Sequence, residues 1–181
     1  MKKNITFILL IVLFHLTACS NFQPPYNNFD SPGFNQQKSP RDLIAALRSE
    51  DVQVIRDGQR LTLIIPTDKF FEFGTAQLND LRYPALNNIA ALVISTSDDR
   101  VYIAGFTDTM NSKESVNVKL SSERAKAMAD FLWAKGFDIQ RIYTKGYGRR
   151  YDIADNQLIH GSAMNRRLEI QWNAKDCGAI D

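Results

Sequence analysis

The sequence predicts an α/β domain whose helices pack on one face of a mixed β-sheet. In some segments apolar residues alternate with polar ones, as in strands, and in others apolar residues recur every three or four positions, as in helices. Segments of these two kinds follow one another along the chain. A short hairpin pattern precedes them. The chain has 181 residues, of which 44% are hydrophobic, and this length suits one such domain with appended segments.

The first predicted elements are a short helix and a β-hairpin. Ser39-Pro40 is typical of an N-cap followed by proline at the first helical position, and the amphipathic helix that it opens ends near Ser49. A strand then begins at Val52 and a second one covers residues 61–65. The turn signal Asp57-Gly58 stands between them, so the two strands are expected to pair as a hairpin.

Alternating helices and strands fill the rest of the domain. The expected elements are a helix over residues 84–94, a strand over 100–106, a helix over 115–135, and strands over 142–145 and 167–172. The long helix carries apolar residues at helical spacing, and Gly136 is placed to end it. This order after a hairpin gives an α/β sandwich, with the domain spanning residues 41–173.

The first 18 residues are typical of a bacterial secretory signal. Lys2 and Lys3 precede an apolar run that is shorter than the roughly 20 residues of a membrane-spanning helix. Small residues lead to Cys19, so the segment resembles a lipoprotein signal in which Cys19 receives acyl chains and becomes the mature first residue. Ser20 follows it, and by that resemblance the destination is the outer membrane. The alternative is an uncleaved anchor helix with an incidental cysteine.

Residues 19–40 are predicted to be the lipidated N-terminus and a linker. Four of the six prolines fall here, and no apolar face repeats. Residues 174–181 are expected to form a C-terminal tail, in which Cys177 is a free thiol or pairs with another molecule. The linker also carries four aromatic residues, which either dock onto a partner protein or only make the linker adhesive: Phe22, Tyr26, Phe29 and Phe34.

Charge and side-chain chemistry argue against nucleic-acid binding and against catalysis. The 22 basic and 20 acidic residues give a net charge of +2, and loss of the two signal lysines leaves 20 of each. Beyond the signal, His160 has no second histidine with which to build a His-based triad or a multi-histidine metal site. Gly146-Tyr147-Gly148 is too short for a phosphate-binding loop. We therefore expect a protein that is not an enzyme and has no metal or cofactor.

A series of motifs follows in fixed order from residue 105 onward. They are Gly105-Phe106-Thr107-Asp108, residues 117–125, Gly136-Phe137, Lys145-Gly146-Tyr147-Gly148, Ala154-Asp155-Asn156 and residues 161–170. With this order the sequence resembles an OmpA-like peptidoglycan-binding domain over roughly residues 60–172. The resemblance implies the OmpA-like α/β sandwich and noncovalent binding of the diaminopimelate-containing stem peptide of peptidoglycan.

The resemblance also implies which side chains bind. The end of the ligand carries an ammonium and a carboxylate, so the site needs one group of each sign. Asp108 matches the acid that accepts hydrogen bonds from the ammonium, and Arg124 matches the base whose two-donor fork holds the carboxylate. The loop of Phe73, Gly74 and Thr75 matches the opposite rim. Further implied binding residues are Thr107, Asn117, Asn165 and Arg167.

Two alternatives remain open at this stage. On spacing alone, an ordinary ion pair between Asp108 and Arg124 that braces a loop against a helix is the favoured interpretation, and only the surrounding motifs favour ligand binding. Arg166 and Arg167 are successive residues near the start of a strand, and alternate residues of a strand face opposite ways. Only one of these two arginines is therefore expected to point into the site.

The sequence departs from the family pattern beside the acid. Phe106 stands where the family usually has histidine, and Asn111 stands where a glycine is expected. Asp108 precedes Arg124 by 16 positions, one more than the commonest family spacing. We therefore expect a remodelled loop after Asp108.

Together these features predict an outer-membrane lipoprotein that holds peptidoglycan and anchors the envelope or a secretion complex to the cell wall. The alternative is a structural subunit of an envelope-spanning secretion machine that uses the same domain mainly for protein contacts. The chain resembles small OmpA-like lipoproteins, including those of the type IVB (Dot/Icm) secretion apparatus. Expected partners are peptidoglycan, the outer membrane through Cys19, and other subunits of such a complex.

Overall fold

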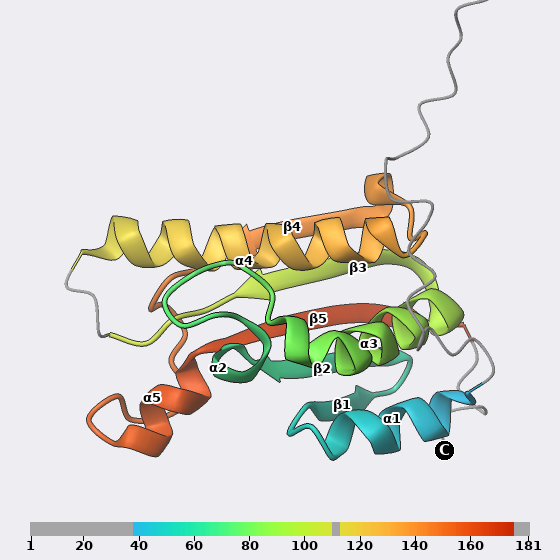
Figure 1. Ribbon diagram of the computed structural model, residues 1–181, viewed down its shortest axis with the longest axis horizontal. Coiled ribbons are helices and arrows are strands. Elements are labelled where there is room, and N and C mark those ends of the chain that lie inside the picture. The colour runs from blue at the N-terminus through green and yellow to red at the C-terminus, as the bar shows by residue number, and fades with distance from the viewer. Residues whose placement is uncertain (1–37, 110–112, 176–181) are drawn as a thin grey trace, which may run out of the picture. The chain divides into compact units, whose positions relative to one another are not determined.

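A computed structural model of the protein describes residues 38–109 and 113–175 (Figure 1). The sheet has five strands in the order β1-β2-β5-β3-β4, and only β3 and β4 are parallel neighbours. This confirms the α/β class and the mixed sheet. The helices and strands are α1 (Pro40–Arg48), β1 (Gln53–Asp57), β2 (Arg60–Pro66), α2 (Thr67–Phe70), α3 (Tyr83–Thr96), β3 (Ser97–Gly105), α4 (Glu114–Ala134), β4 (Ile142–Gly146), α5 (Ile159–Asn165) and β5 (Arg167–Ala174).

The helix and hairpin at the start of the domain form as predicted. Ser39 caps α1, and its side chain and that of Asp42 bond reciprocally to each other's backbone N–H groups, with Pro40 at the first helical position. The hairpin turns at Gly58, whose φ of 59° is a left-handed conformation that glycine adopts without strain. The signal segment, the linker up to residue 37 and the tail after residue 175 lie outside the described residues.

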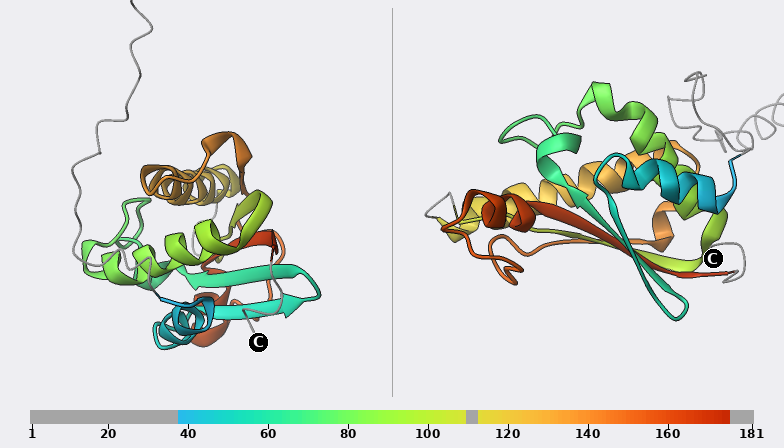
Figure 2. Two further views of the ribbon diagram at one scale, coloured as in Figure 1. Left: turned by 90° about the vertical axis from the view of Figure 1, so that its right-hand side faces the viewer. Right: turned by 90° about the horizontal axis from the view of Figure 1, so that it is seen from below.

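The core lies between one face of the sheet and the helices α1, α3 and α4, which Figure 2 shows on the same side of the strands. Alternate residues of each central strand point into it, as the period of two requires. The indole N–H of Trp172 donates to the hydroxyl of Thr96 at 3.0 Å, so this buried polar pair is satisfied. The main inward side chains of the strands are Leu61, Leu63, Ile65, Val101, Ile103, Leu168, Ile170 and Trp172.

Two glycines allow α4 to lie directly against the sheet. Gly105 of β3 and Gly146 of β4 are register partners on the parallel pair, and both face the helix at Ser121 and Ser122. A Cβ at Gly105 would lie 2.2 Å from the carbonyl oxygen of Ser121, so no larger residue fits there without moving the helix. This close contact fixes where α4 stands relative to the end of β3.

Strand β5 lies between β2 and β3 and runs antiparallel to both. Strands β2 and β3 therefore point the same way and end at the same edge of the sheet, where β5 begins. Two short helices that the sequence did not predict, α2 and α5, stand at this edge as the continuation of β2 and the approach to β5 (Figure 1). Within residues 38–109 and 113–175, none of the helices has the length and apolar character needed to cross a membrane.

Candidate functional site

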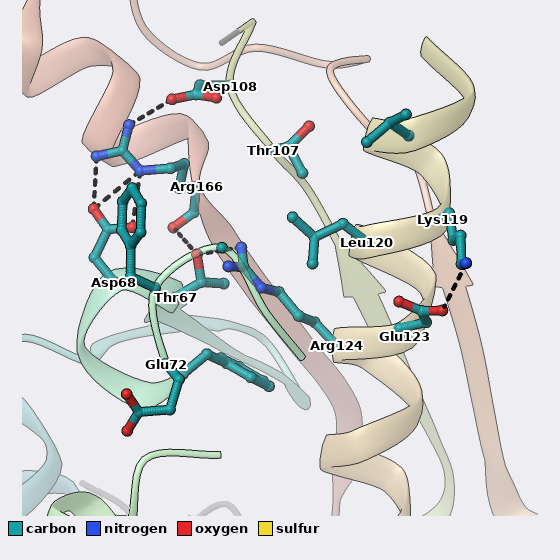
Figure 3. Close-up of a pocket in the computed structure, with 14 residues that line it drawn as sticks. Thr67, Asp68, Glu72, Thr107, Asp108, Lys119, Leu120, Glu123, Arg124 and Arg166 are labelled. Carbon is teal, nitrogen blue, oxygen red and sulfur yellow. Dashed lines mark hydrogen bonds and ion pairs between the residues drawn. The ribbon is translucent and has the colours of Figure 1, made fainter. Parts of the chain in front are cut away.

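A pocket of about 570 Å³ opens at the edge of the sheet where β2 and β3 end (Figure 3). Its walls come from the end of β2 with α2 and the loop that follows, from the end of β3, from one side of α4, and from the residue that precedes β5. Many of its lining side chains are charged or hydroxylic, and apolar side chains such as Phe71 and Leu120 lie among them, so charged groups are set in a partly apolar wall. The principal lining residues are Thr67, Asp68, Phe71, Glu72, Thr107, Asp108, Lys119, Leu120, Glu123, Arg124 and Arg166.

A Thr-Asp pair follows each of the two strands that flank β5. Thr67-Asp68 comes after β2, and Thr107-Asp108 comes two residues after the last residue of β3. Arg166 lies between the two acids (Figure 3). Its Nε donates to both carboxylate oxygens of Asp68 at 2.8 and 3.0 Å and its Nη2 to Oδ2 at 2.6 Å, while its Nη1 donates to Asp108 Oδ2 at 2.5 Å.

Arg124 reaches the pocket from α4 and is 4% exposed. Its Nε donates to the backbone carbonyl of Thr75 at 2.8 Å, and its Nη1 donates to the hydroxyl of Thr67 at 3.1 Å. The guanidinium also lies over the ring of Phe71, with its Cζ 5.5 Å from the ring centroid. None of these three contacts brings a negative charge to Arg124.

The two arginines therefore have opposite electrostatic environments. The hydrogen bonds that Arg166 donates to Asp68, and then the one to Asp108, raise the pKa of Arg166 above its ordinary value, although burial acts against them. Burial lowers the pKa of Arg124, while the charge of Asp68 acts in the other direction. Both side chains remain protonated, because the pKa of arginine lies far above physiological pH. Arg166 is paired with acids, whereas Arg124 is a cation with neutral hydrogen-bond partners.

Thr107, Asp108 and Arg124, which the sequence predicted as binding residues, all line the pocket. Asp108 is 4% exposed, and the structure gives its direct ionic contact to Arg166 rather than to Arg124. The ordinary Asp108–Arg124 ion pair that spacing left open is thus not formed. Asn117 is buried near the start of α4 and does not line the pocket. Of the remodelled loop, residues 110–112 lie outside the described residues, Asn111 among them.

Arg167 does not reach the pocket, although the sequence nominated it. It points to the other face of the sheet, where its Nε donates to Glu169 at 2.8 Å and its Nη2 to the carbonyl of Tyr151 at 3.1 Å. Its guanidinium carbon lies 3.9 Å from the ring centroid of Phe106. The physical reason is strand alternation, which turns Arg166 inward and Arg167 outward. Phe106, which stands in the place of the family's usual histidine, serves here as the platform for Arg167.

Asn165 is fully buried and bonds the loop that precedes α5 instead of lining the pocket. Its Oδ1 accepts from the N–H groups of Ile153 and Ala154 at 2.8 and 3.2 Å. Its Nδ2 donates to the carbonyl of Ala154 at 2.8 Å and to Oδ1 of Asn156 at 3.0 Å. The Asn165 side chain therefore satisfies several polar groups of the loop, and these bonds fix the backbone position directly before Arg166.

We expect Asn165→Ala to lower the free energy of unfolding by about 2 kcal/mol, because it leaves part-buried N–H and C=O groups of the loop without their partner and empties a fully buried position. Denaturant unfolding measures this loss, and hydrogen exchange should show faster exchange at Ile153 and Ala154. Asn173→Ala, on an exposed position of β5, is the matched control and should change stability by less than about 0.5 kcal/mol. Equal effects of the two substitutions would contradict the structural role given to Asn165.

Asp68, Thr67 and Arg166 belong to the pocket, but the sequence did not nominate them as binding residues. The signal that would have found them is the Thr-Asp pair that recurs within two residues of the ends of two strands of the same sheet. This repeated pair indicates a shared site only when it is known that β2 and β3 lie on either side of β5 and end at the same edge of the sheet. That neighbour relation is tertiary, and no local pattern in the sequence carries it.

The sequence profile of the OmpA family matches residues 70–166. The chain belongs to the OmpA family. The match confirms the resemblance that the motifs gave, and it begins at the last residue of α2 and ends at Arg166. Helix α1 and the hairpin of β1 and β2 precede the matched region. Thr67 and Asp68 of α2 also precede it, so these two residues of the pocket wall lie outside the match.

Curated relatives are similar over part of their length. The chain is 32% identical over 138 residues to the probable lipoprotein YiaD of Escherichia coli, covering 76% of this chain and 63% of YiaD. It is 34% identical over 109 residues to outer membrane protein A of Bordetella avium, covering 60% and 56%. It is 42% identical over 98 residues to the peptidoglycan-binding protein ArfA of Mycobacterium tuberculosis, covering 54% and 30%. The chain thus spans less than two thirds of each of these relatives.

Solved structures share the fold. The cell wall anchor of the T6SS from Pseudomonas aeruginosa superposes with a TM-score of 0.68 at 28% identity, covering 76% of this chain and all of that one. The periplasmic domain of Helicobacter pylori MotB superposes with a TM-score of 0.60 at 21% identity, covering 75% and 86%. The first similarity extends over the whole of the other chain, and the second, at 21% identity, supports the fold alone.

Proposed function

We propose that the pocket binds the diaminopimelate-containing stem peptide of peptidoglycan without cleaving it, and that the protein thereby anchors an envelope complex to the cell wall. The observation that carries this proposal is the buried guanidinium of Arg124, whose hydrogen bonds go to the neutral oxygens of Thr67 and Thr75. A cation removed from water gains most from an anionic partner. The planar guanidinium matches a carboxylate in particular.

Asp108 supplies the complementary charge in the same pocket. A carboxylate is an acceptor for an ammonium, so a ligand that carries an ammonium and a carboxylate a few bonds apart can satisfy Asp108 and Arg124 together. The free end of diaminopimelate has both groups on one carbon. Similarity to ArfA, a peptidoglycan-binding protein, and to the cell wall anchor of the T6SS supports this choice of ligand and role.

The proposal includes an anchor at the other end of the chain. Acyl chains on Cys19, which lies outside the described residues, would hold the protein in the outer membrane while the domain grips the wall. Similarity to the probable lipoprotein YiaD and to an outer membrane protein of Bordetella avium supports this part. The identity of the anchored complex, for which the sequence suggests the type IVB apparatus, stays a prediction.

Cosedimentation with purified cell-wall sacculi tests the wall contact. We expect the full-length protein, extracted in mild detergent, to sediment with sacculi and to be released by a soluble diaminopimelate-containing muropeptide. Asp108→Asn should reduce retention to about one tenth, because it removes the charge that receives the ammonium. Asp130→Asn is the matched control, since it removes an exposed acid of α4 paired only with Lys126, and should leave retention unchanged.

The other outcomes of this experiment are also decisive. Equal retention of the wild type and Asp108→Asn would contradict the assignment of the acid. No retention of the wild type would contradict wall binding and favour the alternative, a structural subunit whose domain contacts proteins.

The lipid anchor is tested by Cys19→Ser. We expect this substitution to move the protein from the membrane fraction to the soluble fraction, because no acyl chain can be attached to serine by the same thiol chemistry. Cys177→Ser removes the other cysteine and should leave the distribution unchanged. Membrane association that survives in Cys19→Ser would contradict lipidation and favour an uncleaved N-terminal anchor helix.

A further inference from the structure

The cation that contacts Asp108 in the structure belongs to the protein itself. Nη1 of Arg166 lies 2.5 Å from Oδ2 of Asp108, at the carboxylate that the proposed function assigns to the ligand's ammonium. Binding of the ammonium therefore places a second positive charge beside Arg166. Two cations at one carboxylate repel each other unless another negative charge compensates for one of them.

Asp68 provides that compensation. Three bonds tie it to the Nε–Nη2 edge of Arg166, whereas Asp108 receives a single end-on bond from the remaining Nη1. The two-point contact with Asp68 holds the guanidinium plane without help from Asp108. The bond to Asp108 is thus the one that Arg166 can give up while remaining paired.

The charges of the inner pocket lead to the same conclusion. Asp68 and Asp108 balance Arg124 and Arg166, so these four groups together are neutral. A ligand end with one ammonium and one carboxylate adds no net charge and keeps the balance. Without Asp68 the four positions would carry a net charge of +1, which disfavours an ammonium and favours a ligand with a carboxylate alone.

Resting on the proposed function, we infer that Asp68 is a specificity-determining positioning residue, which neutralises and holds Arg166 so that Asp108 can exchange its bond to Arg166 for a bond to the ligand's ammonium. Asp68 lines the same pocket but acts through Arg166, whose guanidinium it binds with three hydrogen bonds. Its carboxylate contacts Arg166 on the side away from Asp108 (Figure 3), and its side chain is 42% exposed, compared with 6% for that of Asp108. The site therefore selects zwitterionic ends over plain carboxylates with the help of a residue outside the clamp.

The experiment measures binding of two soluble probes to the full-length protein by calorimetry. One probe is a muropeptide with the free amine of diaminopimelate, and the other is the same muropeptide with that amine acetylated. Asp68→Asn should weaken binding of the free-amine probe about tenfold, whereas binding of the acetylated probe should not weaken and should become somewhat tighter. In the Arg166→Gln background, Asp68→Asn should have little further effect, because the charge that Asp68 neutralises is gone.

A matched control separates the effect of this acid from the loss of any acid that pairs with an arginine. Glu50 pairs with Arg82 at 2.8 Å but does not line the pocket, so Glu50→Gln should leave affinity for the free-amine probe unchanged. Thermal unfolding of each variant reports whether the fold is intact. An equal loss for both probes in Asp68→Asn would indicate a structural role and overturn the inference.

The remaining outcomes distinguish this inference from the proposed function. Unchanged binding in Asp68→Asn, or a tenfold loss that persists in the Arg166→Gln background, would overturn the inference while the wild type still binds. A wild type that binds neither probe would overturn the proposed function and the inference with it. Tight binding by the wild type, lost on Arg124→Gln, shows that the proposed site stands whatever the result for Asp68.

Discussion

Arg124→Gln is expected to abolish retention on sacculi and to weaken muropeptide binding about 100-fold, or about 2.7 kcal/mol. The guanidinium is the buried cation whose hydrogen-bond partners are neutral, so it is the group with the most to offer a carboxylate. Glutamine retains similar length and can donate one hydrogen bond, but it carries no charge. Calorimetry with the soluble muropeptide measures the loss, and cosedimentation with sacculi confirms it on the polymer.

Two further variants make this result specific. Arg124→Lys keeps the charge but loses the planar fork, and should weaken binding about tenfold. Arg48→Gln removes an exposed arginine at the end of α1, outside the pocket, and should leave affinity unchanged. Wild-type affinity in Arg124→Gln, with the fold intact by circular dichroism, would contradict the assignment of Arg124 as the carboxylate receptor.

Gly105→Ala is expected to lower the free energy of unfolding by about 3 kcal/mol, with a fall of about 10 °C in Tm. The added methyl group would lie 2.2 Å from the carbonyl oxygen and 2.9 Å from the carbonyl carbon of Ser121. Both atoms belong to the helix backbone, so no side-chain rotation relieves the overlap. Either α4 moves away from the sheet or β3 bends. Thermal and denaturant unfolding of the purified protein measure the effect.

The same chemical change in open space provides the control. At Gly58, in the hairpin turn, no other atom lies within 4 Å of the position that a Cβ would take, but the backbone φ is 59°. Gly58→Ala should therefore cost only the strain of a left-handed residue, about 1 kcal/mol. If Gly105→Ala were no more harmful than Gly58→Ala, the close approach of α4 to β3 would not be a requirement of the fold.

Much of the domain could be predicted from its sequence because its elements carry local signals. The cap at Ser39, the turn at Gly58 and the helix stop at Gly136, which has a φ of 99°, are short-range backbone requirements and all form as expected. The long helix was placed to within a residue at each end, since its buried apolar residues recur at helical spacing.

The elements that escaped prediction lack such signals. Helix α2 has four residues, too few to show a period, and α5 carries the exposed apolar residues Ile159 and Met164 instead of an apolar face turned inward. Strand β3 begins at Ser97, earlier than expected, because its pairing with β5 shifts register between Ser97 and Val101. Irregular pairing of this kind depends on the neighbouring strand.

The residues of the candidate site also differ in whether a local signal in the sequence identifies them. Asp108 and Arg124 stand in motifs that the family resemblance supplied, and both line the pocket. Asp68 and Arg166 meet Asp108 only because β5 lies between β2 and β3, and strand order is not written in any one segment. Arg167 was nominated in place of Arg166 because the motif alone does not tell which of two successive residues faces the helices.

The contact of Ser121 with Gly105 explains how Asp108 and Arg124 line one pocket although the spacing between them is one residue longer than the commonest family spacing. Asp108 is fixed by the end of β3, and Arg124 lies about one helical turn beyond Ser121, which is fixed against the same strand. Neither position depends on the length of the chain that joins them. Insertions can therefore accumulate in that joining segment during evolution while the acid and the base keep their places, so counting residues between them is a poor guide to whether an OmpA family member has kept its site.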